Sequence, residues 1–501
     1  MKPFRIFLFG LSVFIILTLL SVFLRDHYVI FKLFTIKIPS FDRILTNPKP
    51  EYKDIANILK LSDLMKDSIF IEKTDKISVK RIGFKKKQFI DSAKRLNADS
   101  IRALIRPIDF PTGNDSLLNP FFKDLSNLSI DKKLIRIMHY GDSQIEGDRI
   151  TSYVRNQMQL RFGGLGIGLF PVVSINPASS SYVFDLSSNW SRVSPVQNST
   201  ESQTGNKFGA LINYSRIDQP SNIFGKTNEL DAWIDLKRAN ISFSQAQRFR
   251  QCRVFYGFNK APMMVEAKQN QTIVDAEIVP SSAGLKVLRW QFANPVNNLS
   301  ISFKTTESPN IYGIALDAME GIAVDNVPLR GSAGLEFTRT DLNFLRQFYQ
   351  LLNVKLLILQ FGINVVPNVI ENYTYYENSF LRQIEAVKKA CPFLSVIVIG
   401  VSDVSRNGKN GYESFPNVTK IRDAQKRAAF ASGCAFWDMY EAMGGHNSMP
   451  SWVYATPPLA QKDFVHLNPI GAKIIGEMFY RSFIQEYEKY LDTKNKISGE
   501  E

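Results

Sequence analysis

The order of apolar and polar residues divides this chain into regions with two different periodicities. In residues 131–173 and again in 320–492, short apolar runs alternate with longer stretches of helical spacing. Residues 135–138 and 354–359 are typical of buried strands, and residues 375–390 are typical of a helix. Strands that alternate with helices predict a mostly parallel sheet covered by helices, an α/β fold.

The region between these two halves has a different pattern. In residues 174–319, short alternating or β-branched segments recur between turn signals. This spacing predicts a β-sandwich or jelly roll inserted into the α/β domain. Trp190, Trp233 and Trp290 lie in it. Such aromatic side chains can stack on sugars, but they are more often part of a core, so sugar binding is the minority interpretation.

The first 25 residues are predicted to form a membrane anchor. Residues 6–24 carry no charge and are long enough to cross ~30 Å of hydrocarbon. Lys2 and Arg5 precede this run, and no small-residue cleavage site follows it. We therefore expect an uncleaved transmembrane helix, with the bulk of the chain outside the cytoplasm. Residues 26–130 are expected to form a stem with helices, and residues 493–501 a disordered tail.

The 501 residues carry a formal net charge of +14, and residues 72–106 alone hold eleven Lys and Arg against four Asp and Glu. A basic excess indicates nucleic acid, an anionic membrane surface or an anionic polymer as a partner. The chain has no zinc-finger spacing and no RNA-binding aromatic signature, so nucleic acid is the weakest of the three.

Cysteine and histidine are scarce. The three cysteines, Cys252, Cys391 and Cys434, exclude a disulfide framework but leave one bridge open. The four histidines have no metal-ligand spacing with cysteine or glutamate. We therefore predict neither a metal centre nor a cofactor.

One serine stands where chemistry is expected. Ser143 ends the segment Gly141-Asp142-Ser143, directly after the first apolar strand. By itself this segment is typical of a strand-ending turn. However, Ile150 and Met158 belong to a helical pattern that follows, so the serine lies near a helix N-terminus. The dipole there favours a developing negative charge.

Three other residues are expected at the same edge of the sheet. Gly331, Asn364 and His466 all follow strands or stand in loops at helix starts, and in a parallel sheet such positions share one edge. The Gly-x-Ser-x-Gly elbow of α/β-hydrolases is absent from the sequence. Ser402-Asp403 offers an alternative acid, although strand-end capping is the better interpretation.

Taken together, these segments resemble the SGNH/GDSL hydrolase family. The family is marked by several short sequence blocks in a fixed order along the chain. The third block usually reads Gly-x-Asn-Asp, and in this chain Val365 stands where that aspartate would be. The resemblance implies a flavodoxin-like, three-layer α/β/α fold. In chain order the matching blocks are Gly141-Asp142-Ser143, Gly331, Gly362-Ile363-Asn364 and Asp463-Phe464-Val465-His466.

The resemblance also implies roles for these residues. Ser143 would be the nucleophile, His466 the general base, and Asp463 the acid that orients the imidazole. The Ser143 N–H, the Gly331 N–H and the Asn364 amide would form the oxyanion hole. Gly334 is a rival for the role of Gly331.

The inserted module on an exported chain further resembles bacterial peptidoglycan O-acetylesterases, which carry a carbohydrate-binding-like jelly roll. This resemblance implies an envelope-anchored esterase that removes O-acetyl or similar acyl groups from peptidoglycan or a surface polysaccharide. One alternative is an O-acyltransferase with the same triad and a membrane acyltransferase partner. Another is a non-catalytic glycan-binding protein.

Overall fold

The computed structural model describes residues 3–23, 28–30, 35–37, 51–61, 105–176, 181–196, 205–219, 229–239 and 242–498. The chain divides into two compact units, residues 1–52 with 405–413, and residues 53–404 with 414–501. Most of the basic segment 72–106, and with it much of the predicted stem, lies outside the described residues.

The first unit contains a helix, α1 (Pro3–Phe23), and an antiparallel strand pair, β1 (Tyr28–Ile30) with β2 (Thr35–Lys37). The predicted membrane-spanning helix of residues 1–25 falls on α1. In the part of the chain that the structure describes, no helix combines the length and the apolarity that crossing a membrane requires.

A five-stranded, fully parallel sheet organises the second unit. Its spatial order is β15-β3-β16-β17-β20. Numbered along the chain, this is the 2-1-3-4-5 order of a flavodoxin-like fold. The predicted α/β fold with a parallel sheet is therefore confirmed. The strands are β3 (Leu134–Gly141), β15 (Gly321–Pro328), β16 (Val354–Gln360), β17 (Ser395–Ile399) and β20 (Ala435–Trp437).

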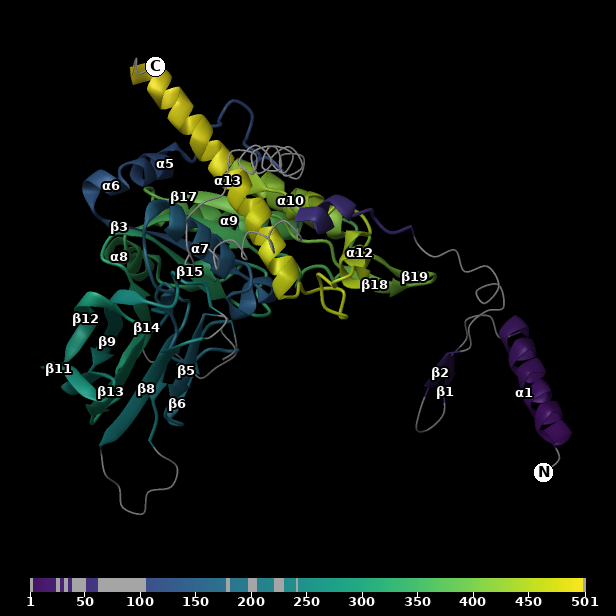
Figure 1. The fold of residues 1–501 in the computed structure, drawn as a ribbon, viewed down its shortest axis with the longest axis horizontal. Coiled ribbons are helices and arrows are strands. Elements are labelled where there is room, and N and C mark those ends of the chain that lie inside the picture. The colour runs from purple at the N-terminus through teal and green to yellow at the C-terminus, as the bar shows by residue number, and fades with distance from the viewer. Residues whose placement is uncertain are drawn as a thin grey trace, which may run out of the picture. The chain divides into compact units, whose positions relative to one another are not determined.

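Helices cover both faces of this sheet (Figure 1). The face that carries Met138, Tyr140 and Leu359 shares one apolar core with three helices, α8, α9 and α10. On the other face, α7 packs on β15 and α13 packs on α7. The helices are α7 (Thr151–Phe162), α8 (Leu342–Leu352), α9 (Thr374–Ala390), α10 (Val418–Ala431) and α13 (Pro469–Ser498).

The helices begin and end where local chemistry dictates. Asp341 caps α8, because its carboxylate accepts the otherwise unpaired N–H groups of Asn343 and Phe344. At the other end of α8, Asn353 adopts the left-handed conformation that commonly stops a helix. The long α13 continues through Ser498, where Thr493 Oγ1 still donates to the Lys489 carbonyl. This corrects the disordered tail predicted from residue 493.

Two antiparallel sheets make up the region between β3 and β15 (Figure 1). One has the order β11-β10-β13-β8-β5, the other β12-β9-β14-β7-β6, and their inner faces enclose a single apolar core. The predicted inserted sandwich is thus present as two antiparallel sheets. Its strands are β5 (Tyr182–Leu186), β6 (Trp190–Val193), β7 (Tyr214–Ile217), β8 (Leu230–Arg238), β9 (Phe249–Asn259), β10 (Met263–Gln269), β11 (Thr272–Val279), β12 (Ser282–Val296), β13 (Asn298–Thr305) and β14 (Asn310–Asp317).

The sandwich is packed firmly against the α/β domain. Aromatic rings of β9 and β14 meet those of α8: Phe255 lies 5.7 Å from Phe348, and Tyr312 lies 5.1 Å from Phe344 between ring centroids. A short strand, β4 (Gly168–Phe170), pairs with β14 although it precedes residue 174, where the sequence predicts the insertion to begin. The second sheet of the sandwich therefore has an apolar core on each of its faces.

A buried ionic cluster also joins the two domains. Arg136, in the middle of β3 and fully buried, donates to Asp325 on β15 and to Asp317 on β14, the latter at 2.6 Å. Arg253 on β9 donates to the same Asp317 at 2.9 Å. Two buried guanidinium groups and two buried carboxylates thus neutralise one another, which burial of charge requires.

The remaining elements are short. In the second unit they are α5 (Asn119–Ser126), α6 (Leu128–Asp131), the 3₁₀ turns η1 (Ser143–Asp148) and η2 (Phe337–Arg339), α11 (Met439–Ala442) and α12 (Ser448–Tyr454). β18 (Ser405–Gly408) pairs with β19 (Gly411–Ser414) in a two-stranded sheet.

The three cysteines are free and buried, so the single bridge that the sequence left open does not form.

Candidate active site

Ser143 stands at the carboxyl end of β3, the strand that pairs with both β15 and β16. Gly141 ends the strand because a Cβ there would lie 2.7 Å from the Gln360 carbonyl oxygen of β16. Asp142 then caps η1, its carboxylate accepting the Gln144 N–H at 3.0 Å. The predicted strand–turn–helix is present, with a 3₁₀ turn between Ser143 and the start of α7.

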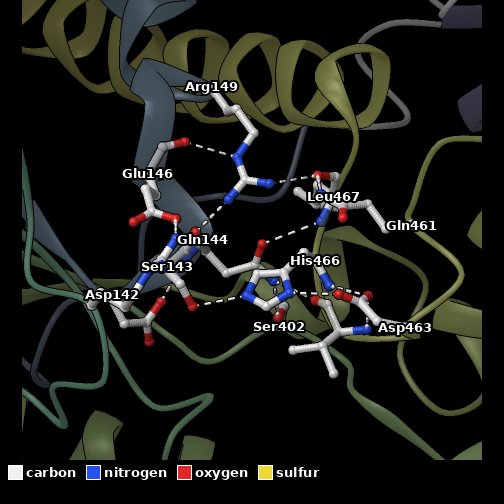
Figure 2. Close-up of polar contacts among 12 residues, drawn as sticks. Asp142, Ser143, Gln144, Glu146, Arg149, Ser402, Gln461, Asp463, His466 and Leu467 are labelled. Carbon is white, nitrogen blue, oxygen red and sulfur yellow. Dashed lines mark hydrogen bonds and ion pairs between the residues drawn. The ribbon is translucent and has the colours of Figure 1, made fainter. Parts of the chain in front are cut away.

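Figure 2 shows that a second loop brings His466 to this serine. His466 Nε2 lies 2.8 Å from Ser143 Oγ, and His466 Nδ1 lies 2.7 Å from Asp463 Oδ2. Asp463 also holds the loop in shape, because its Oδ1 accepts the N–H groups of Val465 and His466, each at 3.0 Å. The structure therefore joins the three predicted triad residues in one chain of hydrogen bonds.

The electrostatics of Asp463 suit an orienting acid. Partial burial raises the pKa of this carboxyl, but the backbone N–H and the ring of His466 and the N–H of Val465 outweigh that effect. The net result is a pKa below the usual value. Asp463 is therefore ionised at neutral pH and available to stabilise a protonated imidazole.

The Asp142 carboxylate also holds the third block, Gly362-Ile363-Asn364, in place. Its Oδ2 accepts the N–H of Ile363 at 3.3 Å, in the loop that follows β16. Burial raises the pKa of Asp142 to about 7, while backbone N–H groups, including those of Gln144 and Ile363, act in the opposite direction. Val365, which replaces the aspartate usual in the family, packs against the apolar core instead. The loop thus has a carboxylate brace from block one.

Gly331 and Asn364 follow β15 and β16, the two neighbours of β3, and so stand at the same sheet edge as Ser143. The Asn364 amide donates to the Ser332 carbonyl at 2.9 Å, which ties blocks two and three together. The N–H of Gly334 donates to Ser332 Oγ at 2.8 Å, so this N–H already has an acceptor within the protein. Gly331, by contrast, is exposed.

Among the described residues, no hydrogen bond joins Gly331 or Asn364 to Ser143. Their place in an oxyanion hole stays a prediction.

Comparison with known proteins bears on the fold. No family model matches the chain, and no curated protein sequence matches it. The chain is similar to a solved structure described as a peptidoglycan O-acetylesterase, with 20% identity and a TM-score of 0.59. The match covers 76% of this chain and 99% of that one. The chain has an SGNH/GDSL hydrolase fold. A carbohydrate esterase family 3 from Talaromyces cellulolyticus is 18% identical over 33% of this chain and 72% of that one, with a TM-score of only 0.25.

Within this SGNH/GDSL fold, Gln144 connects the serine turn to the histidine loop (Figure 2). Its Nε2 donates to the Val465 carbonyl at 2.7 Å and to Ser402 Oγ at 3.1 Å, and its Oε1 accepts the Leu467 N–H at 3.3 Å. The buried amide therefore holds both neighbours of His466. This role could not be assigned from the sequence, where the only signal is a polar residue directly after the serine.

Arg149 makes a parallel connection. Its guanidinium donates to the carbonyls of Ser143 and Glu146 on η1, and to that of Leu467 at 3.1 Å (Figure 2). Side chains from the turn that follows Ser143 thus fix the loop that carries His466. Such supports keep catalytic groups in a productive geometry.

The alternative acid, Asp403, is committed elsewhere. It accepts hydrogen bonds from Ser414 Oγ at 2.6 Å and from the Met449 N–H at 2.7 Å, and its neighbour Ser402 accepts from Gln144. Among the described contacts, none links Asp403 to His466. Asp403 thus holds the first turn of α12 and Ser414, and the predicted strand-end capping is not what its contacts show.

The SGNH/GDSL fold places Ser143 and His466 in a cavity of about 900 Å³. Arg149, Arg330 and Lys473 contribute positive charge to its wall. Asn176, Ser242 and Phe243 come from the inserted region, and Phe243 packs edge-on against Tyr153 at 5.9 Å. These wall residues could not be identified from the sequence, because nothing local in residues 174–319 marks which loop reaches the site.

Proposed function

We propose that this protein is a serine esterase that removes O-acetyl or similar acyl groups from a glycan. The observation that carries this proposal is the continuous chain of hydrogen bonds from Ser143 through His466 to Asp463, opening into a cavity of about 900 Å³. A serine with a base within hydrogen-bond reach, and an acid that orients the base, is the arrangement that acyl transfer needs.

The geometry supports a two-step reaction. His466 Nε2 takes the proton of Ser143 Oγ as this oxygen attacks the ester carbonyl, and the same proton passes to the departing sugar hydroxyl. Water then attacks the acyl-serine with His466 again as the base. Asp463 stabilises the imidazolium formed in both steps. The carboxylic acid and the free serine are the products.

Glycan as the substrate class is supported by the shape of the site. Its wall is shared between the α/β domain and the inserted sandwich, which suits a large alcohol rather than a small one. The solved structure with the same fold is described as a peptidoglycan O-acetylesterase. We therefore propose cell-wall peptidoglycan or a surface polysaccharide as the polymer.

Hydrolysis of p-nitrophenyl acetate and release of acetate from O-acetylated peptidoglycan test the proposal. We expect the purified full-length chain to catalyse both, and Ser143→Ala to lower kcat by at least roughly 10⁴-fold. Ser126→Ala, a remote serine on α5, serves as the matched control. Equal activity of Ser143→Ala and the intact chain would refute the proposal.

The same experiments address acyl transfer. Adding a glycan acceptor gives the acyl-serine a second route of breakdown. Acetylated glycan forming faster than free acetate would replace the esterase proposal with an acyltransferase.

We also propose that the protein works in the bacterial envelope. Support comes from the substrate class and from the uncharged N-terminal run of residues 6–24. Fractionation of cells that express the chain with a C-terminal tag tests this, and recovery in the cytoplasmic fraction alone would contradict it.

A further inference from the structure

A second, smaller cavity of about 80 Å³ lies beside the catalytic one. The two cavities share a wall formed by Glu146, Gly147 and Asn176. The far side of the smaller cavity is built by the sandwich, from residues that include Arg192 and Asn213. A single water needs about 15 Å³ by this measure, so the cavity holds several waters or a small polar group.

Arg192, on β6, is a cation without a counter-ion in this cavity. Its Nη1 donates to the Val173 carbonyl at 3.0 Å, and its buried Nε has no hydrogen-bond partner. No carboxylate of the described residues forms an ion pair with it. Burial lowers the pKa of Arg192 to about 10, and this unfavourable effect is not offset by any nearby acid.

Arg192 is partly buried, and the three arginines that are fully buried differ from it in this respect. Arg136 and Arg253 are paired with aspartates, and Arg155 is paired with Asp148 at 2.6 Å. The other acid in the lining, Glu146, is paired with Arg330 at 2.5 Å. Because both carboxylates of the cavity are already neutralised, no described carboxylate in its lining is left to pair with Arg192.

Asn213 supplies a complementary group. Its Nδ2 donates to the Leu211 carbonyl at 2.7 Å, which fixes the direction of the amide, and its buried Oδ1 has no partner. The preceding residue, Ile212, has a φ of +55°, which is strained for a β-branched side chain. Strain of this kind is found where a site holds its geometry against local preference.

We propose that this second cavity binds the carboxylate end of a sugar acid, with Arg192 taking the carboxylate and Asn213 Oδ1 accepting a neighbouring hydroxyl. The unpartnered donor requires an acceptor and the unpartnered acceptor requires a donor, and a sugar acid carries both. The inference rests on the proposed function, since it makes the cavity a subsite for an anionic glycan whose ester lies at Ser143.

Free acetate is the other source of a carboxylate, because ester hydrolysis releases it. Acetate has no hydroxyl for Asn213. Binding of acetate and of a sugar acid can therefore be compared directly, and a neutral sugar tests the contribution of the hydroxyl alone.

The binding test uses the full-length Ser143→Ala chain, so that its result does not depend on esterase activity. Thermal unfolding is followed with sodium glucuronate, sodium acetate or methyl glucoside, each against sodium chloride of equal ionic strength. We expect glucuronate to raise Tm by about 2 °C, acetate and methyl glucoside to raise it less, and Arg192→Gln to abolish the rise. Arg289→Gln, at an exposed arginine of β12, is the matched control and should keep it.

Two measurements guard against a folding artefact. Without ligand, Arg192→Gln should unfold at the same temperature or higher, because the substitution removes an unpaired, partly buried charge. Arg192→Lys keeps the charge and should retain part of the glucuronate response. A response that is independent of Arg192, or no response to glucuronate, overturns the proposal. An equal, Arg192-dependent response to acetate overturns the assignment to a sugar acid.

Steady-state kinetics provide a second test of the proposal. We measure the ratio of kcat/KM for an acetylated methyl glucuronide to that for an acetylated methyl glucoside. Losing one charge-assisted hydrogen bond should lower this ratio by about tenfold or more in Arg192→Gln, and Arg289→Gln should not change it. If neither ester is hydrolysed, the proposed function fails while the binding result is unaffected. If both are hydrolysed with an unchanged ratio, the carboxylate site fails alone.

Discussion

His139 lies two residues before Gly141 and is fully enclosed beneath the active site. Its Nε2 lies 3.0 Å from Gln360 Oε1 on β16, and its Nδ1 lies 2.9 Å from Thr151 Oγ1 on α7. Burial lowers its pKa to about 4, an effect that Gln360 opposes and Arg155 reinforces. The ring is therefore neutral at neutral pH and joins β3 to a strand and a helix.

This histidine predicts an acid-sensitive fold. Its folded pKa lies below the unfolded value of about 6.5, so the folded protein binds fewer protons between pH 4 and pH 6.5. The resulting stability, about 3 kcal/mol in full, is present above pH 6.5 and is lost as the pH falls towards 4. We expect His139→Gln to remove this part of the pH dependence in urea unfolding at pH 7 and pH 4.5.

His446→Gln, at an exposed histidine, is the control for this experiment. An unfolding free energy that falls between pH 7 and pH 4.5 as much in His139→Gln as in the unmodified chain would contradict the assignment.

At the scale of elements, strand ends determine what the sequence can reveal. Ser143, Gly331 and Asn364 could be assigned to one edge because each follows an apolar run, and a parallel sheet aligns such ends. The contacts of Gln144 with residues 465 and 467 could not, because they join side chains more than 300 positions apart. Periodicity reports which face is buried and carries no information on such distant partners.

The junction of η1 and the histidine loop predicts a positioning role for Gln144. Gln144→Ala removes the amide contacts to Val465 and Leu467, which are worth about 1 kcal/mol each in stability. The loop would then carry His466 less accurately, and we expect kcat to fall by roughly 10- to 100-fold with little change in KM. Steady-state kinetics on p-nitrophenyl acetate measure both quantities.

Gln350→Ala, at an exposed position of α8, should leave these constants unchanged. A rise in KM with an unchanged kcat would instead assign Gln144 to substrate binding.

At the scale of the whole molecule, Arg136 is the residue that the sequence left unexplained. It interrupts the otherwise apolar run 135–138, and only the structure shows that its partners are Asp325 on β15 and Asp317 on the sandwich strand β14. The presence of the two antiparallel sheets was predictable from alternation and turns. Which strands pair was not, because antiparallel register depends on contacts far apart in sequence.

The cluster predicts that the sandwich and the α/β domain depend on each other. Asp317→Asn removes the carboxylate shared by Arg136 and Arg253 and leaves buried positive charge uncompensated, which costs about 3–5 kcal/mol. We expect guanidinium unfolding to show a loss of that size. Asp185→Asn, at an exposed aspartate of the same sandwich, should cost under about 0.5 kcal/mol. A loss below about 1 kcal/mol in Asp317→Asn would show that the cluster does not couple the domains.

The place of the insertion also sets when this protein can become active during its own synthesis. Ser143 and His466 are 323 positions apart, and the sandwich is translated between them. At ~5–20 residues per second, a ribosome needs roughly 16–65 s to pass from one to the other. During that interval the nucleophile is already made, but its base is not. The nascent chain therefore carries an inert serine until the histidine loop has been translated.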